Sequence, residues 1–459
     1  MNFNSLEFLV FFPVVFALHW ILPHRFRWAL LLAASWLFYF WWNPWTGFLL
    51  VGTTLVSWLC AGGIARAKKT VTRRGLLVLA LAVSLGCLGF FKYTGFFASV
   101  AGLEVPFRII LPVGISFYTF QTLSYVIDVY RGRAGAEGHF GYYALFVSFF
   151  PQLVAGPIER PENLLPQLRA ERKFRLDNLS AGGWLLLEGY FKKIVIADGI
   201  APFADRVFGA PGEALGPEVV LAAALFGVQI YCDFSGYSDI ARGAARLLGI
   251  DLMENFRQPY GAKTVREFWR RWHISLTGWF TDYVYIPLGG SRRGLSRQVF
   301  NIMVVFLLSG LWHGAGWTFI IWGLTHGLYQ AGGVLAERRS APTAEKGPVR
   351  SALCHVRTFA LVSFPWLFFR AASLEDAAVL LSRLFTGWGG LLSALGQMFP
   401  AMVLLLACLP LIERMADRQR RREWPASALA VFCAVTAIGL AWLTQLSAGG
   451  QNAFIYFQF

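Results

Sequence analysis

The chain has 459 residues, of which 56% are hydrophobic, 16% aromatic and only 15% charged. This composition excludes a soluble globular domain, in which about a quarter of the residues are charged. The 41 Lys and Arg residues outnumber 26 Asp and Glu residues and give a net charge of +15. In a membrane protein, Lys and Arg are enriched in the cytoplasmic loops. This explains the positive charge without nucleic-acid binding.

Apolar runs long enough to cross a bilayer recur along the whole sequence. They predict an all-α polytopic membrane protein with roughly 11–13 transmembrane or re-entrant helices. The first run carries no basic start and no small-residue cleavage site, so we expect a retained span and not a signal peptide. Because the loops are short, residues 1–459 are predicted to form one membrane domain. The candidate spans are residues 5–22, 28–42, 46–65, 75–93, 109–129, 141–157, 183–200, 218–240, 299–312, 315–333, 353–370, 396–412 and 425–446.

Two basic clusters predict the orientation of the chain. They lie at residues 66–74 and 414–422, each between apolar runs, and the positive-inside rule places both in the cytoplasm. Counting crossings from them puts the N-terminus and residues 449–459 outside the cytoplasm. The six cysteines stand singly, without the paired spacing of a zinc or redox site, so they predict packing residues and no metal.

Ionisable residues within apolar sequence are costly and often functional, and the first segment of this kind is residues 229–242. It places Asp233 and Asp239 directly after an apolar run. On a helix Asp239 reaches Arg242 or Arg246, so we expect a structural ion pair here and no catalytic acid.

The second segment, residues 266–285, interleaves aromatic and arginine residues around His273. An interfacial helix has this composition too. Trp269 lies one helical turn before His273, and no run of exposed polar residues stands beside the histidine, which favours a function. Both interpretations stay open at this point.

The third segment, residues 309–327, holds His313 between tryptophans and glycines in otherwise apolar sequence. Gly314 and Gly316 are expected to let another backbone or a ligand approach His313. A buried neutral imidazole is suited to remove a proton from a hydroxyl. His326 falls on a different helical face and is expected to be structural. The motifs of serine hydrolases, zinc proteases and P-loop ATPases are absent from the sequence.

Four motifs resemble those of the membrane-bound O-acyltransferase family, and in particular its bacterial branch typified by the alginate O-acetylase membrane protein. They are YCDFSGYSD at 231–239, FWRRWH at 268–273, DYVYIPLGG at 282–290 and LWHG at 311–314. They occur in order with short spacers, and the resemblance covers most of the chain. It implies a bowl of tilted helices around a central tunnel that donor and acceptor enter from opposite sides.

The resemblance also implies roles for individual residues. His313 matches the family's deep-lying histidine and is expected to be the catalytic base. His273 matches a second polar position, asparagine in many eukaryotic relatives, and is expected to orient the acyl carbonyl. Charge on the carbonyl oxygen needs a donor, which His273 or a neighbouring tryptophan N–H could supply. Tunnel-lining candidates are Trp269, Trp272, Trp312 and Trp317.

The function implied is a multi-pass enzyme of the bacterial inner membrane. It takes acetyl from a cytoplasmic thioester, with acetyl-CoA as the expected donor and no permanently bound cofactor. It passes the acetyl group across the membrane for O-acetylation of an extracellular polysaccharide, alginate-like or cellulose-like. Expected partners are a periplasmic or membrane-anchored acetyltransferase, the polysaccharide biosynthesis machinery and membrane lipids. The alternatives are a polysaccharide or lipid transporter, or an O-acyltransferase for teichoic acid or peptidoglycan.

The chain ends in a glycine-containing, aromatic tail at residues 449–459. An aromatic anchor at the membrane interface has this composition. The last residues also resemble a tail common in this bacterial branch and in a small partner of the D-alanylation system. That resemblance suggests that the Tyr456 hydroxyl could accept acetyl first and relay it to a partner enzyme.

Overall fold

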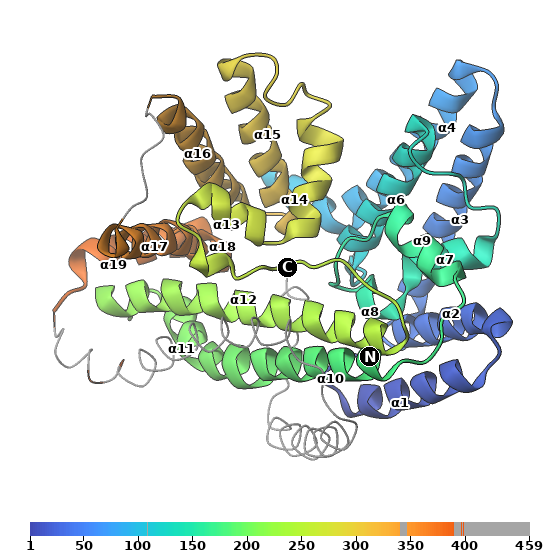
Figure 1. The fold of residues 1–459 in the computed structure, drawn as a ribbon. Helices are drawn as coiled ribbons and strands as arrows, with labels where there is room; N and C mark the ends of the chain where they lie inside the picture. Colours follow the sequence, from blue (N-terminus) through green and yellow to red (C-terminus); the bar gives the residue numbers. More distant parts are fainter. Residues whose placement is uncertain (108, 340–346, 390–395, 397, 399–459) are drawn as a thin grey trace. The chain divides into compact units, whose positions relative to one another are not determined.

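The computed structural model describes residues 1–107, 109–339, 347–389, 396 and 398. Over these residues the chain is helical and contains no strand, which confirms the all-α prediction (Figure 1). The described chain divides into two compact units. The first contains residues 1–190 and 237–254, and the second contains residues 191–236 and those from 255 onward. The single-domain boundary stays a prediction.

Five helical stretches of the described chain are long and apolar enough to cross a membrane, which agrees with a multi-pass membrane protein. Of the other expected spans that are described, 315–333 forms the 23-residue α16, the rest form shorter helices, and 141–157 is split into α7 and α8. The expected spans at 396–412 and 425–446, the basic cluster at 414–422 and the tail at 449–459 lie outside the described residues, apart from 396 and 398. The number of crossings stays a prediction. The five stretches are α3 (Pro44–Arg66), Thr70–Val100, α12 (Gly216–Leu247), α15 (Leu295–His313) and Pro348–Arg370.

In the first unit, α3, α4 and α6 pack against one another and α2 packs against α7 (Figure 1). Local sequence sets several helix ends: the Asn43 side chain accepts a hydrogen bond from the Trp45 N–H at the start of α3. Gly114, which precedes α6, has φ 74°, and a Cβ there would lie 2.8 Å from the Leu153 carbonyl, so only glycine fits. The other helices of this unit are α1 (Leu6–Ile21), α2 (His24–Phe40), α4 (Thr70–Leu88), η1 (Gly89–Tyr93), α5 (Thr94–Val100), α6 (Ile115–Arg131), α7 (Phe140–Ser148), α8 (Phe150–Leu153), α9 (Pro161–Arg169) and α10 (Leu176–Tyr190).

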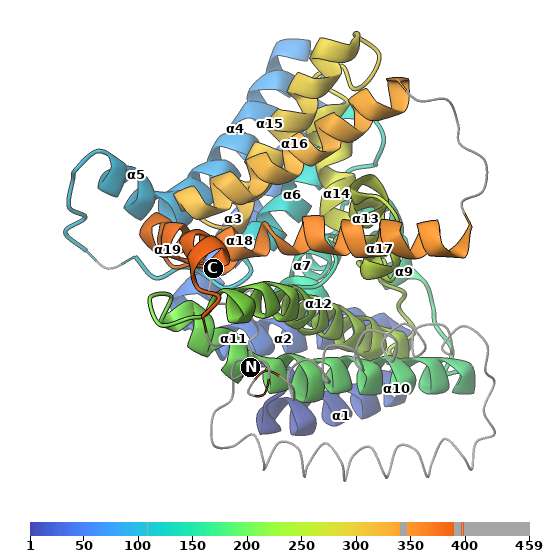
Figure 2. The same cartoon turned by 90° about the vertical axis from the view of Figure 1, so that its left-hand side faces the viewer.

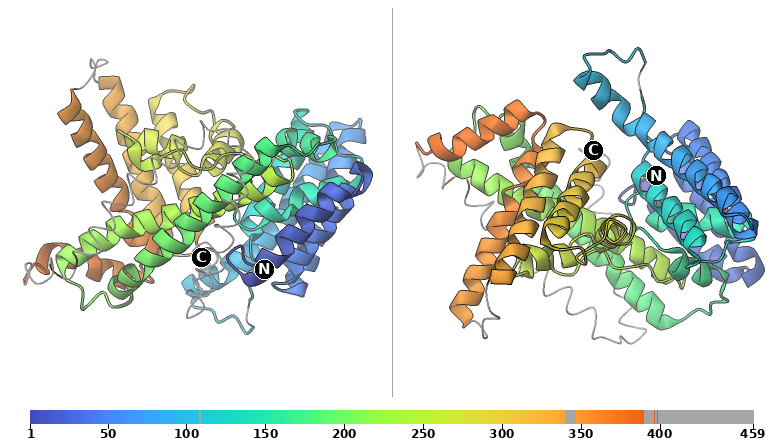
Figure 3. Two further views of the ribbon diagram at one scale, coloured as in Figure 1. Left: turned by 60° about the horizontal axis from the view of Figure 1, so that its bottom comes forward. Right: turned by 90° about the horizontal axis from the view of Figure 1, so that it is seen from above.

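Two glycines bring α10 close to the end of α12 that belongs to the first unit, where the two helices run side by side (Figure 3). A Cβ at Gly182 would lie 2.9 Å from the Gly243 carbonyl, and one at Gly243 would lie 2.8 Å from the Gly182 carbonyl. Small residues allow helix backbones to approach in this way.

In the second unit, α15 and α16 form a hairpin that ends in the short segment 314–316 (Figure 2). Gly310 meets the Phe319 carbonyl and Gly323 meets the Phe306 carbonyl, so a Cβ at either position would clash with backbone. This close approach places the end of α15 against the start of α16. The other elements of this unit are η2 (Phe191–Ala197), α11 (Asp198–Gly209), η3 (Pro259–Gly261), α13 (Val265–Arg271), α14 (Ile274–Phe280), η4 (Thr281–Tyr285), α16 (Trp317–Arg339), α17 (Pro348–Ser363), α18 (Trp366–Arg370) and α19 (Leu374–Thr386).

Candidate functional site

His313 is the last residue of α15, and its residue surface is only 4% exposed. The helix stops there because Gly314 is extended, with φ −156° and ψ 149°. The Phe319 ring occupies the space where a Cβ of Gly314 would lie, so this glycine admits a neighbouring side chain. The C-terminal end of a helix carries partial negative charge. It therefore favours the imidazolium that forms when His313 takes a proton.

Aromatic rings surround the His313 imidazole. The ring centres of Trp312 and Trp322 each lie 5.0 Å from it, and that of Phe369 lies 5.4 Å away. Their planes stand at 68–85° to the imidazole plane. Such walls exclude water and fix the orientation of the ring, as a buried general base requires.

His273 lies between α13 and α14 in a left-handed backbone conformation, with φ 44° and ψ 54°. Residues with a Cβ seldom adopt this conformation, although histidine does so more often than most, and such backbone strain concentrates at functional sites. Asn255 supplies the constraint. Its backbone carbonyl accepts from the Ile274 N–H at 2.9 Å, and its Oδ1 accepts from the Ser275 N–H at 3.2 Å and hydroxyl at 2.7 Å.

The His273 side chain is completely buried and close to His313. Its ring centre lies 4.7 Å from that of Phe234, 5.7 Å from Trp312 and 6.3 Å from His313. His273 is outside the five candidate membrane-spanning stretches, and burial lowers its pKa to about 3. The imidazole is therefore neutral at physiological pH.

The structure thus brings together the two histidines that the sequence singled out. A direct N–H···N bond between two imidazoles places their ring centres roughly 5 Å apart, and 6.3 Å exceeds that separation. At this separation the two rings do not bond each other directly. Their catalytic roles stay predictions.

The four tryptophans expected to line a tunnel differ in position. Trp269, Trp272 and Trp312 are buried, whereas Trp317 at the start of α16 is 50% exposed. The Trp269 indole N–H donates to Nδ1 of His326 at 3.3 Å, which gives that fully buried histidine a structural partner. The tunnel itself stays a prediction.

The acids of the segment 229–242 form ion pairs. Arg242 lies 3.5 Å from Asp239, which confirms the expected pair, and Arg246 pairs with Asp251 instead. Asp233 lies 2.6 Å from Nζ of Lys193, which is also 3.0 Å from Asp198. Lys193 was not identified from the sequence. It lies within the apolar stretch 190–197, so the rule that ionisable residues in apolar sequence are often functional could have found it.

Two further residues of this cluster were not identified from the sequence. Asn255 sits in an ordinary polar stretch, and Trp322 resembles any apolar residue of a membrane helix. Only packing shows that Asn255 holds His273 and that Trp322 faces His313. Tyr456 lies outside the described residues. Among the residues that the structure does describe, no group of three His, Cys, Asp or Glu side chains could hold a metal ion.

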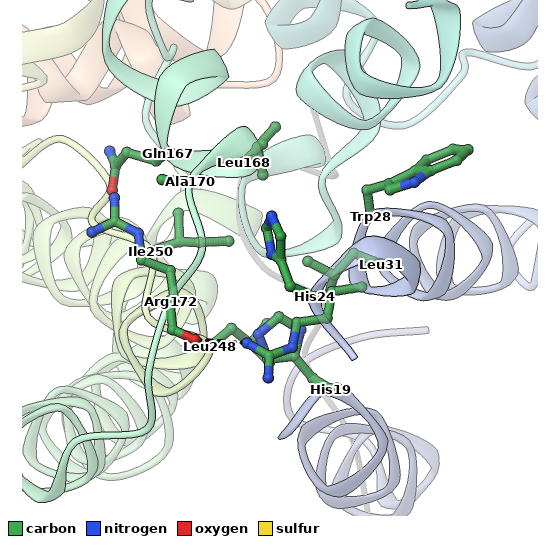
Figure 4. Close-up of a pocket in the computed structure, with 11 residues that line it drawn as sticks. His19, His24, Trp28, Leu31, Gln167, Leu168, Ala170, Arg172, Leu248 and Ile250 are labelled. Atoms are coloured by element: carbon green, nitrogen blue, oxygen red, sulfur yellow. Dashed lines mark hydrogen bonds between the residues drawn. The ribbon is translucent and has the colours of Figure 1, made fainter. Parts of the chain in front are cut away.

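A second pair of histidines, His19 and His24, lines a small pocket in the first unit (Figure 4). Arg27 donates to the carbonyls of Leu22 at 3.1 Å and Arg172 at 2.7 Å. These bonds connect α2 to the segments around it. The lining residues include no carboxylate or hydroxyl group. They are His19, His24, Arg27, Trp28, Leu31, Gln167, Leu168, Ala170, Arg172, Leu248 and Ile250.

Comparison with known proteins decides the family. The model of the membrane-bound O-acyltransferase family matches residues 133–369, a range that contains His273 and His313. The chain belongs to this family. Membership confirms the resemblance drawn from the four motifs, and it makes the protein a membrane O-acyltransferase.

Relatives within and around the family act on different acceptors, according to their names. The chain is 37% identical to the probable alginate O-acetylase AlgI of Pseudomonas putida, over 100% of both proteins. It is 37% identical to the peptidoglycan O-acetyltransferase of Helicobacter pylori, over 82% of this chain and 78% of that protein. It is 29% identical to the teichoic acid D-alanyltransferase of Bacillus subtilis, over 48% of this chain and 58% of that protein.

Proposed function

We propose that the protein is an inner-membrane O-acetyltransferase that takes acetyl from cytoplasmic acetyl-CoA and passes it across the membrane for O-acetylation of an extracellular polysaccharide. One observation carries the proposal: two buried imidazoles lie 6.3 Å apart within the range that matches the O-acyltransferase family. A hydroxyl and a thioester held beside them would react as if in one molecule.

In the proposed reaction His313 takes the proton of an acceptor hydroxyl while the hydroxyl oxygen attacks the acetyl carbonyl carbon. The C–O bond forms and the C–S bond breaks, and the departing thiolate receives the proton from His313. The negative charge that develops on the carbonyl oxygen needs a hydrogen-bond donor, either His273 or a neighbouring indole N–H.

The acceptor polymer is proposed to be alginate-like or cellulose-like. The relative that matches over the full length of both chains is named as an alginate O-acetylase, which supports this choice. The similarity to a peptidoglycan O-acetyltransferase favours a second candidate, acetylation of peptidoglycan. Deleting the gene and measuring bound acetate in both polymers distinguishes them. Loss of acetate from the exopolysaccharide alone is expected, and loss from peptidoglycan alone would overturn the proposal.

Transfer to the polymer is proposed to need a periplasmic or membrane-anchored acetyltransferase together with the polysaccharide biosynthesis machinery. Tyr456 would carry the acetyl group to that partner, because a phenolic ester is more activated than an alkyl ester. Tyr456→Phe keeps the aromatic ring and removes only the hydroxyl. We expect polymer acetylation to be lost while thioester hydrolysis persists, and full acetylation by this variant would exclude the relay.

Thiol release from acetyl-CoA tests the donor and the enzyme activity directly. Purified protein in detergent should release free thiol slowly without an acceptor and faster with one. The His313→Ala variant supplies the background. Wild-type release equal to that background would contradict the acetyl-CoA proposal.

A further inference from the structure

The hydrogen bonds of Asn255 determine which nitrogen of neutral His273 carries the proton. The Ser275 backbone N–H lies 3.2 Å from the Asn255 side-chain atom that faces it. A backbone N–H only donates, so that atom must be the carbonyl oxygen Oδ1 and not the amide nitrogen. The Ser275 hydroxyl, at 2.7 Å, donates to the same oxygen.

The same oxygen lies 3.3 Å from Nδ1 of His273. An amide oxygen accepts and never donates, so Nδ1 must hold the hydrogen. A neutral imidazole has one N–H only. Nε2 therefore carries the lone pair, and it can accept a hydrogen bond from an acceptor hydroxyl. It has no hydrogen to give to an acyl oxygen.

The donor for the acyl oxygen must then come from another side chain near His313. Trp322 is fully buried, and its ring centre lies 5.0 Å from that of His313. Within the described part of the chain its indole N–H has no hydrogen-bond acceptor. A buried N–H is rarely left in this state unless a ligand completes it. Trp269 donates to His326. Among the described residues the Trp366 indole N–H has no acceptor either, but it lies beside the Tyr260 hydroxyl, and no ring contact joins it to His313 as one joins Trp322.

We propose that Asn255 is a positioning residue that holds His273 as a hydrogen-bond acceptor, and that the Trp322 indole N–H donates to the acetyl carbonyl oxygen during transfer. The inference rests on the proposed acetyl transfer for the role of Trp322. The protonation state of His273 is independent of that function and can be measured without substrate.

Nitrogen NMR of the full-length protein in lipid nanodiscs, with ¹⁵N-labelled histidine, tests the first part. The chain has seven histidines, so the signals that vanish in His273→Gln identify the ring. We expect Nδ1 to be protonated and Nε2 to be unprotonated at neutral pH. The opposite pattern would overturn the role of Asn255, whatever the enzyme's substrate proves to be.

Asn255 variants test the positioning by activity. Asn255→Asp keeps an oxygen that accepts from Nδ1 and from Ser275, whereas Asn255→Ala loses it. We expect Asp to retain at least ten-fold more activity than Ala, and to shift the pH profile upward because a carboxylate favours the charged imidazole. Equal losses with unchanged pH profiles would show that Asn255 only supports the fold.

Tryptophan variants test the second part. Trp322→Phe should lower kcat by about 10²-fold with little change in KM, because the lost bond forms only in the transition state. Trp366→Phe is the matched control, since it removes a buried indole whose ring centre lies 5.8 Å from that of Trp322. Melting temperatures of all variants report folding. Equal losses in both variants, or a larger kcat loss in Trp312→Phe, would contradict the assignment to Trp322.

Discussion

The two pairs of histidines, one in each unit, differ in what surrounds them. His273 and His313 are enclosed by aromatic rings, with Phe234, Trp312, Trp322 and Phe369 among their ring contacts. His19 and His24 line a pocket whose walls include two arginines. Hydrogen bonds to the backbone carbonyls of Leu22 and Arg172 give Arg27 a structural role there.

A histidine's surroundings, and not its burial alone, therefore make it suitable for proton transfer. His19 is as buried as His313, at 4% exposed for each residue. His19 also lies in the last turn of its helix, α1, so what distinguishes His313 is its enclosure by aromatic rings and the His273 imidazole 6.3 Å away. The predictions below test this contrast in order of decreasing effect.

His313→Ala should lower acetyl transfer by about 10³-fold or more, because the general base is lost. His24→Ala, in the other pair, should change transfer by less than about three-fold. Thiol release from acetyl-CoA measures both, and membrane protein level shows whether each variant is inserted. Normal transfer by His313→Ala would end the proposed mechanism, and loss of the protein itself would indicate a structural histidine.

Lys193→Met should lower the free energy of unfolding by about 3–5 kcal/mol, because Asp233 would remain buried without its cation. The matched control is Arg242→Met, which removes the more exposed partner of Asp239 and should cost less than about 1 kcal/mol. Melting temperature in detergent measures both. Equal melting temperatures would show that the Lys193 pair contributes no more than the Arg242 pair.

His273→Ala should lower acetyl transfer by about 10²-fold, because it removes a group that orients the reaction. His326→Ala should lower it by less than about ten-fold, since that ring pairs with Trp269. Initial rates at saturating acetyl-CoA provide the comparison. A greater loss of acetyl transfer in His326→Ala than in His273→Ala would contradict the structural role assigned to His326.

The last prediction concerns pH, whose effect on stability is the smallest of the four near neutral pH and grows only below about 6.5. The pKa of folded His273 is lowered to about 3, so between that value and about 6.5 the unfolded chain binds a proton that the folded chain does not. Stability should therefore fall as the pH is lowered from about 6.5 towards 3. In His273→Gln the melting temperature should change less steeply with pH. An unchanged slope of melting temperature against pH would contradict a neutral, buried His273.

Local sequence was enough to predict the all-α membrane fold and the family, and it singled out the two histidines that the structure brings together. Hydrophobic composition and run length require membrane helices, because a helix satisfies its own backbone hydrogen bonds in lipid. His313 was identifiable because a histidine within apolar sequence is costly. The Asp239–Arg242 pair followed from helical spacing alone, since residues three apart share a face.

Tertiary structure decided which residues meet and therefore what His273 can do. Asn255 reaches the His273 ring across 18 residues, and Lys193 reaches Asp233 across 40. No local pattern encodes such contacts, because they depend on how distant segments pack. The left-handed backbone of His273 is likewise imposed by Asn255 and contrary to local preference. The sequence by itself determined that histidines lie in apolar segments. Packing determined that His273 is held as a hydrogen-bond acceptor, with its ring centre 6.3 Å from that of His313.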